Sequence, residues 1–426
     1  MPENIISLLG IFVLLGIAWL LSNNRRKFPW RVAGWGLGLQ MVLAVILLET
    51  PWGVAVFDAA RSFVTRLLSF TDAGSAFMWG NLFRTSSDLV ANMNPDQGYM
   101  QVTNSATGQL VPLGTIFVIH VLPTIIFFSS LMAVMYHLGV MQRIIQGIAW
   151  VMRKTMGTSG GETLSCAANI FVGQTEAPFV VKPYLAAMTN SELMAVMVGG
   201  FATVAGGVMA AYVRFGIDAG HLLAASVMSA PAALVVAKIM YPETEESATK
   251  DGAGLAIPRE YANLLDAAAG GAGVGLKLAA NVGAMLLAFI ALVAMLNYGL
   301  GFVGLSLQQI FGWIFSPIAW VMGVPWTEAM VFGNLLGTKI AVNEFVGYIQ
   351  LAEAARQGLL SPRSVIIATY ALCGFANFSS IAIQIGGIGT IAPGRRSDVA
   401  RLGLKAMFGG ALASWLTATI AGVLLI

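Results

Sequence analysis

Residues 169–178 read NIFVGQTEAP, a polar stretch inside an otherwise apolar part of the chain. Gly173 and Pro178 disfavour a continuous helix here. A carboxylate at membrane depth costs about 3 kcal/mol on insertion scales, so it usually faces the protein interior or a solute path. We therefore predict the tip of a re-entrant hairpin, whose hydrogen-bonding side chains are Asn169, Gln174, Thr175 and Glu176. The alternative is a purely structural pair between Glu176 and Lys182.

The whole chain is far more apolar than a soluble domain of its size. Its 426 residues are 57% hydrophobic and 10% charged, with a mean hydropathy of +0.79. A membrane crossing needs roughly 20 apolar residues. We predict an all-α integral membrane protein with about eight crossings, from charge-free runs at 5–24, 32–48, 110–142, 193–213, 219–237, 278–327, 364–394 and 406–426.

The positions of the basic residues predict the orientation. Basic stretches at 25–31, 143–154 and 395–405 fall on one side when the crossings are threaded. The positive-inside bias places them in the cytoplasm, so both termini are expected outside the cell membrane. These anchors account for the net charge of +3, which gives no reason to expect a nucleic-acid partner.

Two halves of the chain repeat one arrangement. The polar segment 242–261 divides them and is expected to be a cytoplasmic linker, followed by an interfacial helix near 258–268. Each half pairs a short polar segment (158–184 and 327–351) with a Gly-rich helix. This pattern indicates two re-entrant hairpins and discontinuous helices in a transporter built from inverted repeats.

Two further polar clusters occur in the second half. Asn343 and Glu344 lie side by side in an apolar context, where a structural pair between Glu344 and Lys339 is the alternative. The run CGFANFSS at 373–380 combines an amide and hydroxyls with aromatic residues, although small residues are also typical of close helix packing. Acids with adjacent amides and aromatic faces suit a polar solute such as a sugar or a nucleoside.

The strings GQTEAP (173–178), NEF (343–345) and CGFANFSS (373–380) resemble the signature motifs of the concentrative nucleoside transporters, of the sodium-coupled bacterial type. The resemblance extends over the whole chain. It implies eight helices and two hairpins, a homotrimer, and an elevator movement of a transport domain against a scaffold. It divides the chain into scaffold (1–157), first transport repeat (158–242), linker with interfacial and long scaffold helices (243–310), and second transport repeat (311–426).

The same resemblance implies roles for individual residues. The nucleobase would contact Gln174, Thr175, Glu176 and Val208. The ribose would contact Glu344, Phe375, Asn377 and Ser380. A sodium ion would be held by Asn169, Thr203 and the carbonyls of Val172 and Val204. Residue 203 is Thr where a relative has Ser, and both side chains carry a hydroxyl. Without the resemblance, the alternative is that this hydroxyl simply bonds back to a carbonyl of its own helix.

Several interpretations remain open at this point. Uridine, adenosine and cytidine are all suitable substrates, and coupling to protons instead of sodium is an alternative. A second alternative is a cation/proton antiporter or channel, in which Glu176 and Glu344 would relay protons. A membrane-embedded enzyme has little support, because the histidines at 120, 137 and 221 are scattered and neither HExxH nor GxSxG occurs.

Overall fold

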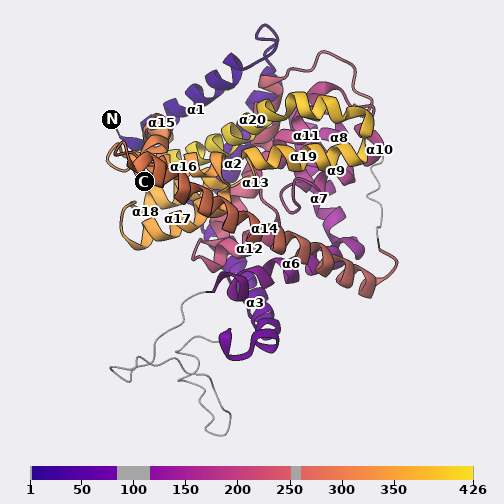
Figure 1. Ribbon diagram of the computed structural model, residues 1–426. Coiled ribbons are helices and arrows are strands. Elements are labelled where there is room, and N and C mark those ends of the chain that lie inside the picture. The colour runs from indigo at the N-terminus through magenta and orange to yellow at the C-terminus, as the bar shows by residue number, and fades with distance from the viewer. Residues whose placement is uncertain (1, 84–115, 251–260, 426) are drawn as a thin grey trace, which may run out of the picture.

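The computed structural model describes residues 2–83, 116–250 and 261–425, which form helices and no strand (Figure 1). Seven crossings are long and apolar enough to be recognised by length and composition. The eighth is α18 (Pro362–Leu372) with α19 (Phe378–Ile391), whose break leaves pieces of only 11 and 14 residues. The all-α class is confirmed for the described residues, and the eight predicted crossings correspond to the seven long spans together with the broken helix α18–α19.

The first half begins with three long helices, α1 (Glu3–Leu20), α2 (Trp30–Glu49) and α3 (Pro51–Trp79), and the short turn η1 (Gly80–Leu82). There follow α5 (Phe117–His120), α6 (Leu122–His137), α7 (Val140–Met156), α8 (Gly160–Ala168), α9 (Ala177–Val180), α10 (Lys182–Leu185), α11 (Asn190–Ala202), α12 (Gly206–Arg214) and α13 (Ala219–Met240).

The second half begins with the longest helix, α14 (Leu264–Gly301). There follow α15 (Leu307–Val321), α16 (Ala329–Ala341), α17 (Glu344–Arg356), α18, α19, the turn η2 (Pro393–Arg395) and α20 (Arg396–Leu424). The apolar run 278–327 thus contains a turn after Gly301, which separates α14 from α15.

The elements of the two halves follow the same order. A crossing, a shorter helix, a hairpin of short helices, a broken helix and a final crossing appear first as α6, α7, α8–α10, α11–α12 and α13. They appear again as α14, α15, α16–α17, α18–α19 and α20. Three crossings per half return the chain to the opposite side, so the second half is inverted relative to the first.

The hairpins are too short to cross. The nine residues of α8 rise about 14 Å, and the 13 residues of α16 about 20 Å, against a hydrocarbon core of about 30 Å. Each therefore ends inside the membrane, and the chain returns through α9–α10 or α17. Their tips carry the polar residues at 169–176 and 342–344.

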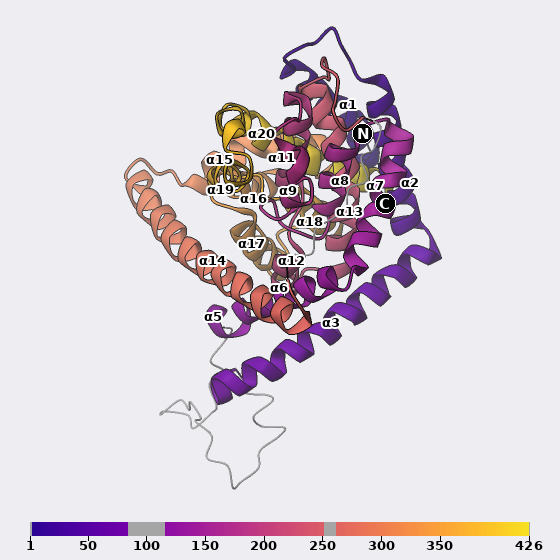
Figure 2. The same ribbon diagram turned by 90° about the vertical axis from the view of Figure 1, so that its right-hand side faces the viewer.

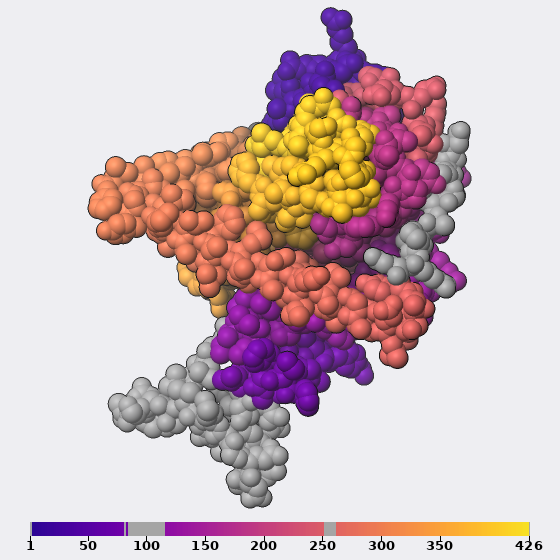
Figure 3. Space-filling model, turned by 45° about the vertical axis from the view of Figure 1, so that its right-hand side comes forward, coloured from indigo at the N-terminus to yellow at the C-terminus, as the bar shows by residue number. Residues whose placement is uncertain are grey.

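The bundle has an inside and an outside. The crossings Asn190–Arg214, Ala219–Met240 and Pro393–Leu424 are 83%, 89% and 83% buried over their most apolar stretch, whereas Leu264–Gly301 is 11% buried. Figure 2 shows α14 and α3 as long arms along the outside of the bundle, and Figure 3 shows α14 lying across one face. The broken helices and hairpins thus occupy the interior.

Helix α14 differs in one respect from the sequence-based expectation. Of the interfacial helix expected near 258–268, residues 264–268 are the beginning of α14 itself, and residues 258–260 lie outside the described ranges. The helix packs closely on α6, where a Cβ at Gly275 would lie 2.7 Å from Ile126 Cα. Ser130 Oγ donates to Ala268 O at 2.8 Å and fixes the same contact.

The two broken helices meet at their breaks. Gly374, in the break between α18 and α19, has φ +127°, a conformation that disfavours any side chain. A Cβ there would lie 2.5 Å from the carbonyl oxygen of Phe201, near the end of α11. This contact brings the break of the second broken helix against that of the first.

Candidate functional site

The tip of the first hairpin is fastened by its backbone. Phe171 O accepts the N–H of Gly206, the first residue of α12, at 3.0 Å. Ile170 O accepts Ser226 Oγ of α13 at 2.9 Å. Because the tip has no regular helix to satisfy its carbonyls, these partners fix it at membrane depth.

Gln174 connects this tip to the second half of the chain. Its Nε2 donates to Ser380 Oγ at 3.0 Å, and its Oε1 accepts Nε2 of Gln384 at 3.2 Å. Gln384 also donates to Met197 O at 3.1 Å, which anchors it on α11. Gln174 is buried, and its amide orientation is fixed on both sides.

Glu344 is the acid of the second tip and is 4% exposed. Its Oε1 accepts Tyr212 Oη at 3.0 Å, and its Oε2 accepts Asn377 Nδ2 at 3.1 Å. Asn377 in turn caps α19 by accepting the N–H of Ser380 at 2.9 Å. Gln174, Ser380, Asn377, Glu344 and Tyr212 therefore form one continuous polar chain, which we call the polar chain below.

Aromatic rings cover one side of Glu344. Tyr212 lies 4.2 Å from Tyr348 and 5.3 Å from Phe345, measured between ring centroids. Tyr348 is held by donating its hydroxyl to Thr369 O at 2.8 Å. These rings exclude water from the carboxylate and strengthen its hydrogen bonds.

The structure therefore brings together Gln174, Glu344, Asn377 and Ser380, four of the expected substrate-binding residues. Thr175 is half-buried against Gly387, where a Cβ would meet its Cγ2 at 3.4 Å. Glu176 is exposed, with Oε2 folded over Gly173.

Two other expected residues lie nearby in sequence without joining the polar chain. Val208 is buried in α12, and Phe375 is half-buried in the α18–α19 break. The structural alternatives are not found: within the described ranges neither Glu176 with Lys182 nor Glu344 with Lys339 forms an ion pair.

Two members of the network were missed from the sequence. Gln384 follows Ser380 by four positions, which places both on one helix face, and this spacing was available as a signal. Tyr212 lies in an apolar helix, and only its contact with Glu344 reveals its role.

Two of the residues expected to hold sodium, Asn169 and Thr203, have oxygen atoms that suit that ion. Asn169 is fully buried, and its Nδ2 donates to Ser165 O at 3.0 Å. Its Oδ1 has no hydrogen-bond partner in the described part of the chain, which is costly unless a cation binds there. Thr203 Oγ1 donates to Gly199 O at 3.0 Å, so its lone pairs stay available. Gly199 itself abuts Asn169, since a Cβ there would lie 3.3 Å from Nδ2.

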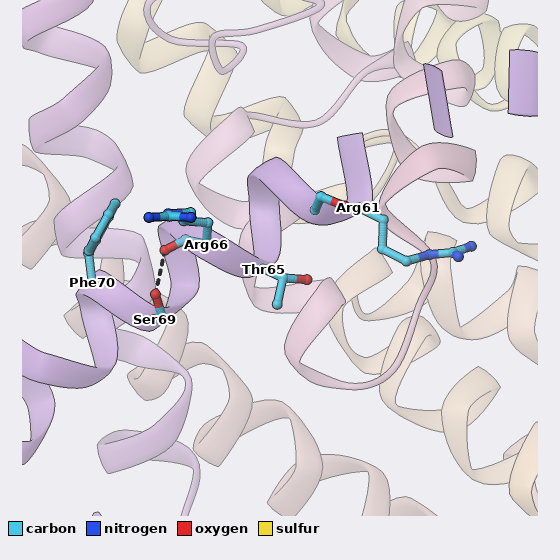
Figure 4. A pocket seen from close by; sticks show the side chains of 6 residues that line it. Arg61, Thr65, Arg66, Ser69 and Phe70 are labelled. Carbon is cyan, nitrogen blue, oxygen red and sulfur yellow. Dashed lines mark hydrogen bonds between the residues drawn. The ribbon is translucent and has the colours of Figure 1, made fainter. Parts of the chain in front are cut away.

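An open hollow of about 510 Å³ lies on the surface of α3, away from these residues, and is lined by Arg61, Ser62, Thr65, Arg66, Ser69 and Phe70. Figure 4 shows the side chains of Arg61 and Arg66 pointing in opposite directions, so they do not form one anion clamp. Arg61 instead donates to Asp218 Oδ2 at 2.6 Å. Burial alone would raise the pKa of Asp218, but the hydrogen bonds from Arg61 and from the backbone N–H of His221, together with the nearby positive charge, outweigh burial and lower that pKa.

Family models cover nearly the whole chain. The model described as Na+ dependent nucleoside transporter N-terminus matches residues 9–82, and the corresponding C-terminus model matches residues 221–422. Between them, a model described as nucleoside recognition matches residues 118–219.

Individual proteins agree with these models. An uncharacterized transporter of Haemophilus influenzae is 45% identical over 98% of this chain and 97% of its own length. Sodium/nucleoside cotransporter 1 of Rattus norvegicus is 43% identical over 99% of this chain, which spans 64% of that longer protein.

Solved structures share the fold. CNTnw in an inward-facing substrate-bound state matches with a TM-score of 0.88 and 42% identity, covering 99% of this chain and 98% of that one. A CNTnw variant in an intermediate state gives 0.89 and 43%, covering 99% of both. With matching domains in order and relatives similar along the full chain, this protein belongs to the family of sodium-dependent, concentrative nucleoside transporters.

Proposed function

We propose that the chain imports nucleosides across the cell membrane by sodium symport. The observation that supports this most directly is the polar chain, which runs from Gln174 of the first half to Glu344 of the second. It lies inside the bundle, next to a set of neutral oxygen ligands for a cation. The polar chain and the proposed cation ligands both include residues of the broken helices, which commonly form transport sites at the bilayer midplane.

The chemistry of the polar chain suits a nucleoside. The Gln174 amide offers one donor and one acceptor side by side, as the edge of a nucleobase requires. Glu344 and Asn377 offer an acceptor and a donor to vicinal ribose hydroxyls. Because Gln174 and Ser380 bond each other at 3.0 Å, a nucleoside entering between them replaces one hydrogen bond with two.

The remaining roles follow from family membership. Thr175, Glu176 and Val208 would line the base, and Phe375 the ribose. Sodium would bind Asn169, Thr203 and the carbonyls of Val172 and Val204. We propose that the ion fixes the first tip, because Asn169 begins the same segment that carries Gln174.

Simple energetics support symport. One positive charge moving inward through 100 mV releases about 2.3 kcal/mol. Since 1.4 kcal/mol is a factor of ten, one sodium ion per nucleoside supports a gradient of about 40-fold from the membrane potential alone.

For the conformational cycle we propose an elevator movement. Residues 158–242 and 311–426 would move as the transport domain, against a scaffold formed by residues 1–157 and 243–310 within a homotrimer. The close α6–α14 contact, outside the buried helices, supports a separate scaffold. CNTnw has been solved in inward-facing, outward-facing and intermediate states, which supports alternating access in the family. The basic stretches support a cell-membrane location with both termini outside.

The test is uridine uptake into proteoliposomes with an inward sodium gradient, compared with choline. We expect the uridine concentration inside the vesicles to exceed the concentration outside only when the sodium gradient is present. Equal uptake in choline, with a proton gradient driving it instead, would establish proton coupling. If uridine gave no saturable heat in calorimetry, the channel or antiporter interpretation would replace symport.

A further inference from the structure

Lys339 is a fully buried lysine at the inner end of the second hairpin, in α16. Its Nζ donates to Ser414 Oγ at 2.7 Å and to Ala371 O at 2.9 Å, and lies 3.5 Å from Cys373 O. In the described part of the chain no carboxylate lies within ion-pair distance of this ammonium. Oxygens of neutral groups therefore supply its whole coordination.

The position of this ammonium matters because of the repeat. Cys373 is the C-cap of α18, the first piece of the second broken helix, and Thr203 is the C-cap of α11, the first piece of the first one. Lys339 comes from the first helix of hairpin 2, and Asn169 follows the first helix of hairpin 1. The Lys339 ammonium thus lies, in the second repeat, between the same two elements that hold the proposed sodium site in the first: the first helix of the hairpin and the break of the following helix.

The local electrostatics are equivalent at the two places. A helix that stops inside the membrane leaves carbonyls without partners, and its C-terminal end carries roughly half a negative charge. In the first repeat, a sodium ion from solution would coordinate such carbonyl oxygens. A lysine ammonium has the same charge and three donors, and here all three have an oxygen within reach.

We propose that Lys339 is a resident cation that fills the second repeat's counterpart of the sodium site, so that this chain binds one sodium ion per nucleoside. This inference rests on the proposed function and specifies its stoichiometry. A resident ammonium moves with the protein in both directions and adds no net charge over a cycle, whereas a second bound sodium would add one.

The first experiment uses the unaltered protein. Charge movement and radiolabelled uridine uptake are measured together in proteoliposomes at fixed potential. We expect one charge per uridine. Two charges per uridine would overturn the resident-cation proposal and leave symport intact, whereas uridine uptake without sodium-dependent charge movement would instead contradict the proposed function.

The second experiment removes the ammonium. Lys339→Ala exposes the carbonyls of residues 371 and 373 to any small cation. We expect a lower melting temperature in choline, partial recovery in sodium with a steeper dependence on sodium concentration than the wild type, and a charge ratio that rises toward two. The proposal would be contradicted if the melting temperature of Lys339→Ala were lowered by the same amount at every sodium concentration and the variant still moved one charge per uridine.

Lys238→Met is the matched control. Lys238 is also buried, at 4% exposure, but it pairs with carboxylates, lying 2.7 Å from Glu162 and 3.3 Å from Glu243. Its loss should lower the melting temperature without steepening the sodium dependence. If Lys339→Ala does not fold, a ratio of two charges per uridine in the unaltered protein would still overturn the proposal.

Discussion

Asn377 and Glu344 are joined at 3.1 Å, and the bond has a fixed direction. Asn377 Oδ1 accepts the N–H of Ser380 at 2.9 Å and the hydroxyl of Ser379 at 2.7 Å. With its oxygen engaged as a helix cap, the amide presents its NH₂ to the carboxylate. Glu344 thereby keeps an acceptor role, which a hydroxyl of a ligand needs.

Replacing Glu344 by Gln tests this role. The variant keeps the size of the side chain and loses charge-assisted hydrogen bonds worth about 1.5–3 kcal/mol. We expect the dissociation constant for uridine, measured by calorimetry, to rise tens-fold with assembly unchanged. Glu353→Gln is the control, because Glu353 lies on the same helix and pairs only with exposed partners. Unchanged affinity in Glu344→Gln would remove this residue from the ribose site.

Gln384→Ala tests a positioning role. Without its Nε2, Gln174 Oε1 has no donor and the amide can rotate away from Ser380. We expect uridine affinity to fall about ten-fold, in line with a loss of about 1 kcal/mol or more. Gln357→Ala, an exposed amide, should change nothing. A lower melting temperature in Gln384→Ala with full uridine affinity would show that the residue is only structural.

Thr203→Val tests the cation ligand. The change removes Oγ1 at nearly constant volume, so we expect the sodium concentration for half-maximal uridine binding to rise about ten-fold or more. Thr203→Ser should restore it. Thr417→Val is the control, since Thr417 also bonds back to its own helix, at 3.0 Å from Ala413 O. A sodium dependence identical in all three variants would place the ion elsewhere.

Gly374→Ala tests the crossing of the broken helices. A methyl group at φ +127° and 2.5 Å from Phe201 O is expected to destabilise the fold by more than about 2 kcal/mol. The melting temperature of the purified protein reports this. Gly386→Ala, on α19 with open space around its Cβ, should be neutral or slightly stabilising. Equal melting temperatures for the two variants would contradict the tight crossing.

The sequence predicted the parts of the site that are polar residues in apolar surroundings. Glu344 and the segment of Gln174 were singled out because acids and amides are costly in lipid and must have partners. Asn377 and Ser380 were assigned to the site through the family resemblance. Tyr212 was missed because a tyrosine within an apolar helix is unremarkable until its hydroxyl is seen on Glu344. The position of a hydroxyl depends on helix packing, and the periodicity of one segment does not encode it.

The same limit applies to helix boundaries. Charge-free runs located the crossings, because lipid solvates them, and the turn after Gly301 agreed with a run too long for one element. Residues 264–268 were expected to belong to a separate interfacial helix, whereas they form the beginning of α14. The helix begins directly after the polar segment 242–261 and is capped by Asn263, which accepts the N–H of Asp266 at 2.9 Å, so its first residues were expected to lie at the membrane interface.

The bond between Gln174 and Ser380 spans 206 positions of the chain. At a synthesis rate of about 5–20 residues per second, the ribosome needs about 10–40 s to produce the second partner after the first. During that interval the amide of Gln174 has to remain hydrated or shielded by the insertion machinery. Biogenesis of this protein therefore depends on a waiting period, and a chain truncated before α19 would be left with unpaired polar groups for quality control to recognise.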